Sequence, residues 1–226
     1  MKRHIIILIS ILYSALSYSQ TVKELIINAD NLTNEKSYKE AITLYSKALN
    51  IDSTDSDCYF KRGQAYFFAQ NDKSAVKDFN KAISLDSENA RIYFMRGQSK
   101  KYLGDKQGAI SDYAIAIEKD STFTPPYIKR AYIFFGMGIY DAAFVFFTKA
   151  INIDPNQTAD VYFARGYTYQ VSHAYQQALD DYSKAIELKP NYPEVYLNMA
   201  NSALNLKTYD KAFEYYGKAL ELTPGN

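Results

Sequence analysis

The residues best suited to catalysis are scarce and far apart in this sequence of 226 residues. It contains one cysteine, Cys58, and two histidines, of which only His173 lies outside the first twenty residues. A Cys–His nucleophile pair needs both side chains within hydrogen-bond reach. The sequence repeat described below places these two residues three repeats apart. We therefore expect no such pair and no catalytic residue. A single cysteine also excludes an intramolecular disulfide framework.

An acidic run at residues 52–57 is the other segment that could hold a ligand. Its sequence, Asp-Ser-Thr-Asp-Ser-Asp, has the carboxylates of a calcium loop but lacks the central glycine and the closing glutamate. A helix end followed by an N-capping Ser or Asp accounts for the run better. The glycines match no phosphate-binding loop, because no Gly-Lys-Ser/Thr follows them. The sequence therefore predicts no metal and no cofactor.

Composition and charge make a protein partner more plausible than a nucleic acid. The chain has 26 Lys and Arg against 25 Asp and Glu, a formal net charge of +1. A near-neutral chain lacks the long-range field that gathers phosphates, so we expect no nucleic-acid partner. With 47% hydrophobic residues, of which many are Tyr or Phe, the chain can bury a core.

Residues 1–19 have the order of a secretory signal peptide. Lys2 and Arg3 make a positive start, residues 5–16 form an apolar run, and residues 17–19 give a small-x-small cleavage signal. Twelve helical residues extend only about 18 Å, short of the roughly 30 Å hydrocarbon core, which disfavours an uncleaved anchor. We expect cleavage at the end of this segment and an exported mature chain, periplasmic or secreted, with no membrane span.

A sequence repeat fills the remainder of the chain. An alanine recurs at an interval that varies by no more than a single position: Ala41, Ala75, Ala109, Ala143, Ala178 and Ala212. An aromatic residue follows this alanine by four positions and a second alanine by seven. With Thr158 as the one insertion, the six repeats are 22–55, 56–89, 90–123, 124–157, 159–192 and 193–226. A period of this length is typical of solenoids.

Each repeat has the periodicity of two helices. In the second repeat, Tyr59, Gly63 and Tyr66 are spaced to share one buried helical stripe. The prolines fall near the beginnings and ends of repeats, where a helix tolerates them. A glycine or alanine recurs in the first helix: Ala29, Gly63, Gly97, Ala131, Gly166 and Ala200. We expect these small residues to let the two helices approach closely, so that a larger side chain there would overpack.

This order of residues resembles the tetratricopeptide repeat (TPR) family. The clearest match is YFARG at 162–166, followed by YQQA at 175–178 and KP at 189–190. The resemblance covers residues 22–226. It implies an all-α fold, a right-handed superhelical solenoid of antiparallel helix pairs, and a non-enzymatic protein.

In TPR proteins the first helix of each repeat lines a concave surface that binds peptides or partner helices. The corresponding residues here are Phe60, Gln64, Phe67, Phe94, Gln98, Lys101, Ile128, Tyr132, Phe135, Phe163, Tyr167, Gln170, Leu197, Asn201 and Leu204. Their spacing keeps each set on one helix face. Two interpretations stay open: the aromatic side chains fill space between first helices, or they line a groove whose amides bond a peptide backbone. Large exposed apolar patches are uncommon on monomers that have no partner, and this favours the groove.

An arginine stands directly before the small residue in four repeats: Arg62, Arg96, Arg130 and Arg165. An aspartate occupies one common position in the second helix of three of them: Asp78, Asp112 and Asp181. This co-occurrence favours an ion pair within each repeat over an anion-binding ladder. Arg130 has Phe146 at the aspartate position, and is the candidate for another role.

The sequence shows no helix after the last repeat, and we expect that repeat to be uncovered. We therefore expect Phe213, Tyr216 and Leu220 to be exposed and to support self-association as a homo-oligomer. The leading hypothesis is an exported interaction scaffold that binds a protein or peptide partner in an aromatic groove. The alternatives are a self-assembling structural component of an envelope complex, and a binder of glycans or small ligands.

Overall fold

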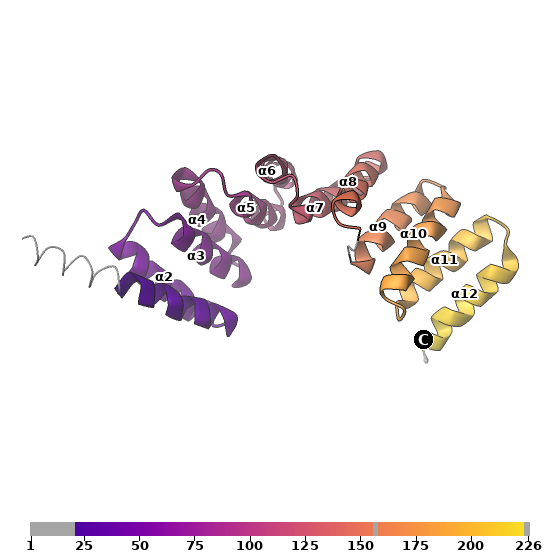
Figure 1. The fold of residues 1–226 in the computed structure, drawn as a ribbon, viewed down its shortest axis with the longest axis horizontal. Helices are drawn as coiled ribbons and strands as arrows, with labels where there is room; N and C mark the ends of the chain where they lie inside the picture. The colour runs from indigo at the N-terminus through magenta and orange to yellow at the C-terminus, as the bar shows by residue number, and fades with distance from the viewer. Residues whose placement is uncertain (1–20, 156–157, 224–226) are drawn as a thin grey trace, which may run out of the picture. The chain divides into compact units, whose positions relative to one another are not determined.

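The computed structural model describes residues 21–155 and 158–223, and the regular structure in that part of the chain is helical throughout (Figure 1). A helical segment at residues 21–34 is followed by α2 (Tyr38–Ile51), α3 (Ser56–Phe68), α4 (Asp72–Leu85), α5 (Ala90–Tyr102), α6 (Lys106–Lys119), α7 (Thr124–Gly136), α8 (Tyr140–Ile153), α9 (Ala159–Val171), α10 (Tyr175–Leu188), α11 (Pro193–Asn205) and α12 (Tyr209–Leu222). The predicted all-α fold of helix pairs is confirmed. The predicted signal peptide, residues 1–19, lies outside the described residues.

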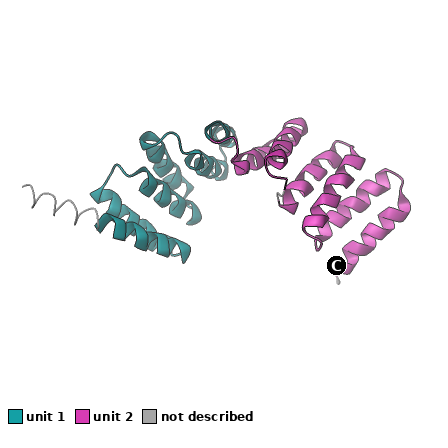
Figure 2. Cartoon of the chain, viewed as in Figure 1, with its two compact units in different colours: residues 1–119 teal, residues 120–226 magenta. Residues whose placement is uncertain are grey.

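The chain divides into two compact units, unit 1 (residues 1–119) and unit 2 (residues 120–226) (Figure 2). In unit 1 the helices from residue 21 to the end of α6 pack in succession, and in unit 2 those from α7 to α12 do so. The labelled helices have 13 or 14 residues each, a length that is marginal for an isolated helix in water. Each helix therefore depends on the neighbours within its unit.

The turn within each helix pair passes through one residue of positive φ: Lys36, Gln70, Gly104, Gly138, His173 and Lys207. Glycine adopts this left-handed conformation without strain, whereas the four other side chains adopt it at a cost. His173 has the same place as the two glycines and is exposed, which confirms that it is a turn residue. In the acidic run, the Asp55 carboxylate accepts a hydrogen bond from the Cys58 backbone N–H at 2.9 Å. The predicted N-cap is thereby confirmed.

Five second-helix aromatic residues are 1% exposed or less: Tyr45, Phe79, Tyr113, Phe147 and Tyr182. Where the first helix has glycine, the ring takes the place that a Cβ atom would fill. An added Cβ at Gly97 would lie 2.7 Å from Tyr113 Cε1, and one at Gly63 would lie 2.6 Å from Phe79 Cε1. Real side chains essentially never approach so closely, so the predicted steric role of these glycines is confirmed.

Arginine side chains tie three helices together in three of the pairs. Arg165 on α9 donates from Nε and Nη2 to both carboxylate oxygens of Asp181 on α10, at 2.7 Å each. Its Nη1 donates to Thr148 Oγ1 on α8 at 3.2 Å. The same bidentate pair joins Arg62 to Asp78 and Arg96 to Asp112. The predicted ion pairs are confirmed, and each arginine also reaches the second helix of the preceding pair.

Arg130 on α7 is held differently. Its guanidinium carbon lies 4.4 Å from the centroid of the Phe146 ring, and Phe134 stacks on Phe146 at 5.6 Å with an interplanar angle of 8°. Arg130 Nε is buried without a hydrogen-bond partner among the described residues, and burial lowers the pKa of this guanidinium. A cation–π contact therefore replaces the ion pair in this repeat.

We predict that Asp181→Ala lowers the free energy of unfolding by about 3 kcal/mol or more, because it removes the partner of the largely buried Arg165 guanidinium. Urea unfolding followed by circular dichroism would measure this. Asp180→Ala is the matched control, since Asp180 is the adjacent exposed carboxylate and its loss should cost about 0.5 kcal/mol or less. Equal effects of the two substitutions would show that the pair does not stabilise the fold.

Candidate functional site

A cavity of about 320 Å³ opens on the first-helix side of unit 2. We call it the unit 2 pocket. Its lining residues come from α7, α8, α9 and the residue before α11: Tyr132, Phe135, Phe147, Asp160, Phe163, Ala164, Tyr167 and Tyr192. Of these, Tyr132 is 40% exposed and Tyr167 is 38% exposed, so two aromatic side chains remain open to a ligand.

Ring contacts connect the walls of the unit 2 pocket. The Tyr167 centroid lies 5.6 Å from that of Phe135 and 6.3 Å from that of Phe163. Phe163 is in turn 5.4 Å from Tyr192, and Tyr132 meets Phe147 edge-on at 5.1 Å. These separations are within the range of favourable aromatic pairs. The walls are therefore supported by one another and by the core ring of Phe147.

Asp160 gives this aromatic cavity its charge. It lies in the first turn of α9, where the helix dipole favours a carboxylate. Burial raises the pKa of Tyr192, and so does its hydrogen bond to the Asp160 carboxylate. Burial likewise raises the pKa of Tyr132, with a smaller contribution from the charge of Asp160. Both phenols therefore remain neutral at physiological pH, and the Tyr192 hydroxyl donates to Asp160.

A second cavity, of about 560 Å³, lies in unit 1 at the ends of α3 and α5. We call it the unit 1 pocket. It is lined by Phe67, Phe68, Gln70, Asp72 and Tyr102. Phe67 and Tyr102 are 5.7 Å apart between ring centroids, and Lys101 Nζ lies 5.8 Å from the Tyr102 centroid. Burial raises the pKa of the Asp72 carboxyl.

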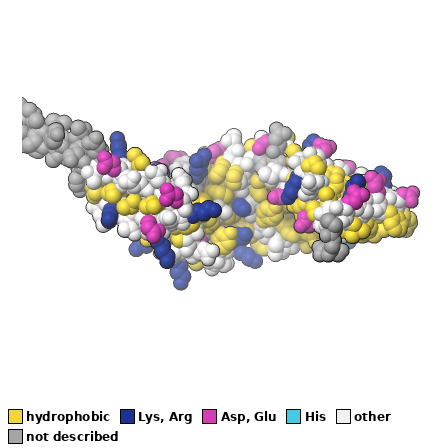
Figure 3. All heavy atoms as spheres, turned by 90° about the horizontal axis from the view of Figure 1, so that it is seen from below, with side chains coloured by type: hydrophobic (Ala, Val, Ile, Leu, Met, Phe, Trp, Pro, Cys, Tyr) yellow, Lys and Arg dark blue, Asp and Glu magenta, His cyan; other side chains and the backbone are white. Residues whose placement is uncertain are grey.

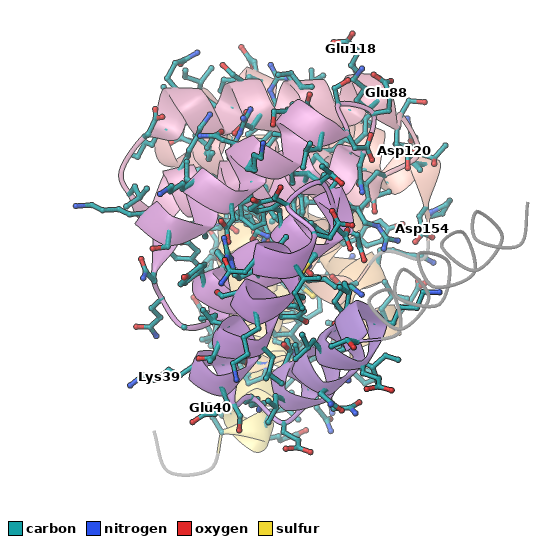
Figure 4. The ribbon with its side chains drawn as sticks, turned by 90° about the vertical axis from the view of Figure 1, so that its left-hand side faces the viewer. Lys39, Glu40, Glu88, Glu118, Asp120 and Asp154 are labelled. Atoms are coloured by element: carbon teal, nitrogen blue, oxygen red, sulfur yellow. The ribbon has the colours of Figure 1, made fainter. Side chains whose placement is uncertain are left out.

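Among the described residues, the one cysteine is buried and no metal-binding cluster is present. Cys58 is 1% exposed, and burial raises the pKa of its thiol to about 12, so it stays protonated. Residues 21–155 and 158–223 contain no group of three or more His, Cys, Asp or Glu side chains placed to hold a metal ion. Charged side chains such as Lys39 and Glu40 lie on the outside of the ribbon (Figure 4).

Comparison with known families identifies the fold. Family models described as tetratricopeptide or TPR repeats match residues 29–68, 56–89, 125–157, 159–192 and 193–226. The chain belongs to the tetratricopeptide repeat family. No helix among the described residues of this TPR chain is both long and apolar enough to cross a membrane.

The curated relatives match parts of this TPR chain. "Tetratricopeptide repeat protein 6" from Homo sapiens is 32% identical over 100 residues, which are 44% of this chain and 19% of the relative. "Heat shock protein STI1" from Saccharomyces cerevisiae is 31% identical over 87 residues, 38% of this chain and 15% of the relative. The chain thus spans about a fifth or less of the length of these two proteins.

Solved TPR structures share the fold over most of the chain. The C-terminal part of a TPR protein from Cytophaga hutchinsonii has a TM-score of 0.77 at 24% identity, covering 87% of this chain and 78% of that one. PilF from Pseudomonas aeruginosa also reaches 0.77, at 18% identity, with 93% and 95% covered. YrrB, whose structure is described as a TPR protein with an unusual peptide-binding site, reaches 0.62 at 24% identity, with 84% and 97% covered.

The structure brings together four of the residues predicted to line a groove. Tyr132, Phe135, Phe163 and Tyr167 all line the unit 2 pocket. Phe67 lines the unit 1 pocket instead. Aromatic residues at this helix face therefore pack between neighbouring first helices, and some of them remain accessible. Peptide binding at this face stays a prediction.

The prediction that Phe60 lines the groove is wrong. Phe60 is only 9% exposed and packs on Phe79 in the core, at 6.0 Å between centroids. Phe94 is half-buried and lies 5.8 Å from the Tyr113 ring. Ile128 is also half-buried and packs against the unit 2 core. For these residues the space-filling interpretation applies, because the neighbouring helix covers them.

The Gln170 amide, predicted to face a peptide backbone, makes hydrogen bonds within the chain. Its carbonyl oxygen accepts hydrogen bonds from Tyr182 at 2.8 Å and from Ser202 at 3.1 Å. Its amide nitrogen donates to Asn198 Oδ1 at 3.3 Å. The amide of Gln170 is therefore engaged inside the fold.

The other predicted groove residues differ in accessibility. Gln64 and Gln98 are half-buried, and the Gln98 amide donates to Met95 Sδ at 3.5 Å. Lys101 and Asn201 are exposed, and Asn201 accepts a hydrogen bond from Tyr216 at 2.7 Å. The two leucines predicted on α11, Leu197 and Leu204, are also exposed.

Sequence reasoning missed Asp160 and Tyr192. Asp160 lies three positions before Phe163 and seven before Tyr167, so extending the helix face by one turn would have included it. Tyr192 precedes α11 and reaches the pocket only because the chain packs it against Phe163. No pattern within one repeat indicates that contact.

The predicted self-association surface is partly exposed. Phe213 is 75% exposed and Leu220 is 61% exposed on α12, and hydrophobic side chains reach the surface at the α11–α12 end of Figure 3. Tyr216 is different, since it is half-buried and its hydroxyl is bonded to Asn201. Tyr209, at 56% exposure, lies with Phe213 and Leu220 on one face of the helix.

Proposed function

We propose that this protein is an exported, non-enzymatic scaffold that binds a protein or peptide segment through the first-helix face of its repeats. The observation that carries the proposal is the unit 2 pocket, where four first-helix aromatic residues surround a cavity of about 320 Å³. Pockets of this size with aromatic walls and one polar group are typical ligand sites. TPR relatives support a role in protein–protein interaction.

Burial of aromatic surface supplies the affinity in this proposal. Fully burying an aromatic side chain contributes on the order of 1.5–3 kcal/mol. The partner contacts the open faces of Tyr132 and Tyr167 and parts of the other walls. After the cost of association is subtracted, the summed binding free energy corresponds to a micromolar dissociation constant. Because the rings already support one another, little ordering accompanies binding.

A random peptide library selected against the full chain tests this proposal. We expect peptides with micromolar dissociation constants by calorimetry, and at least tenfold weaker binding to the Tyr132→Ala, Tyr167→Ala double variant. Circular dichroism would verify that the variant is folded. Leu103→Ala, at an exposed leucine of unit 1 that lines neither cavity, is the control and should bind normally. Unchanged peptide affinity in the double variant would refute the groove, and selective binding of oligosaccharides would favour the glycan alternative.

We also propose that the chain is exported after removal of residues 1–19, on the basis of the leader pattern in the sequence. Expression of residues 1–226 in a bacterial host should give an exported product whose mass begins at residue 20. Deletion of residues 1–19 should retain the chain in the cytoplasm. An exported product that keeps the leader intact would contradict cleavage.

Self-assembly is a second candidate function, favoured by the apolar face of α12. Tyr209, Phe213 and Leu220 expose more than half of their surfaces there, and a second copy of the chain is the proposed occupant. Light scattering should detect a concentration-dependent dimer that Phe213→Lys with Leu220→Lys abolishes. Leu103→Lys, at an exposed leucine in unit 1, is the control. A strict monomer at high concentration would exclude this function.

A further inference from the structure

The unit 2 pocket combines aromatic walls with a single carboxylate. Six of its lining residues are aromatic: Tyr132, Phe135, Phe147, Phe163, Tyr167 and Tyr192. Among the described residues that line it, Asp160 is the only charged one. An aromatic ring presents a negative face, and a carboxylate adds a full negative charge. The lining is therefore electrostatically suited to a cation and not to an anion.

We propose that the unit 2 pocket binds the ammonium group of a lysine side chain carried by the partner segment. This inference rests on the proposed function and specifies the chemistry that the pocket recognises. The lysine methylene groups lie against the rings, and the ammonium group lies near Asp160 and the ring faces. Attraction of an alkylammonium ion to aromatic faces within about 6 Å of their centroids is well established.

The ring geometry suits a cation that contacts several rings at once. Phe135, Tyr167, Phe163 and Tyr192 follow one another with centroid separations of 5.6, 6.3 and 5.4 Å. Their successive planes are inclined by 46°, 27° and 48°, so the rings do not form one flat wall. A cation placed beside both Tyr167 and Phe163, whose centroids are 6.3 Å apart, can therefore lie within about 6 Å of both centroids.

Asp160 adds charge complementarity to the rings. It is an exposed residue, and an isolated ion pair at such a site contributes little. Here its carboxylate accepts a hydrogen bond from the Tyr192 hydroxyl, which holds the negative charge beside the aromatic rings that line the cavity. We therefore expect Asp160 to distinguish a cation from a neutral group of the same shape.

The chain already places its own cations on neighbouring aromatic rings. Lys189 Nζ lies 3.9 Å from the centroid of Tyr192, and the Arg130 guanidinium lies 4.4 Å from that of Phe146. Lys189 is not among the residues that line the cavity. Tyr192 thus accepts an alkylammonium group within the fold, and the rings of Phe163, Tyr167 and Tyr132 remain for the lysine of a partner.

The experiment uses three probes on the full chain: N-acetyl-lysine amide, choline, and 3,3-dimethylbutanol, the neutral isostere of choline. Ligand-observed NMR would measure dissociation constants and the upfield ring-current shift of protons near the cation. We expect N-acetyl-lysine amide and choline to bind at least tenfold more tightly than the neutral alcohol. Asp160→Asn should weaken the binding of both cations at least fivefold and leave the dissociation constant of the alcohol unchanged.

Asp180→Asn is the matched control, because Asp180 is an exposed carboxylate on α10 outside the cavity. It should leave all three dissociation constants unchanged. Equal binding of choline and its neutral isostere, or equal effects of the two Asp→Asn substitutions, would overturn the cation site. Binding of choline but not of N-acetyl-lysine amide would overturn lysine as the occupant. N-acetylglucosamine is measured in the same way as a fourth probe, and tighter binding of it than of either cation would overturn lysine as the occupant in favour of a glycan.

The peptide selection separates this inference from the proposed function. Peptides that depend on Tyr132 and Tyr167 but contain no basic residue would refute the lysine site and leave the scaffold function standing. If N-acetyl-lysine amide binds in a way that depends on Asp160 but no peptide is selected, the cation site is supported and the peptide-binding function is refuted. Selected peptides with a lysine whose replacement by norleucine costs at least tenfold in affinity would support both.

Discussion

The contact between a second-helix aromatic ring and the small residue of the first helix is the constraint on which each repeat depends. Phe79, Tyr113 and Tyr182 are almost fully buried, and each occupies the space that a side chain at the facing glycine would need. Helices of 13 or 14 residues have too little intrinsic stability to form alone. The close approach of paired helices lets these short segments bury continuous apolar stripes, and thereby makes the solenoid stable.

The arginine network adds directional contacts to this packing. In three repeats a bidentate Arg–Asp pair joins the two helices of a pair, and a third donor group reaches the helix before them. Desolvation of the charges opposes such buried pairs, so the removal of one partner, which leaves the other charge buried and unpaired, is strongly destabilising. Arg130 is the exception, because its guanidinium lies over the rings of Phe146 and Phe134 and not against a carboxylate.

The unit 2 pocket is a direct consequence of the same packing. Phe147 is a core ring of the α7–α8 pair and also lines the cavity, so one wall of the pocket is a fully buried core side chain. Tyr132, Phe163 and Tyr167 extend this aromatic surface outward. A site built in this way is preorganised, and the proposed partner gains affinity because the rings need little rearrangement.

The sequence by itself determined the helix pairs, the close approach of the helices at the small residues and the Arg–Asp pairs, because all of these depend on spacing within one repeat. It also predicted four of the pocket's residues from the periodicity of one helix face. Only the tertiary structure decided that Phe60 is buried, that the Gln170 amide is already bonded, and that Asp160 and Tyr192 complete the pocket. Helical periodicity says which side chains share a face, whereas accessibility depends on neighbouring helices that the local pattern does not encode.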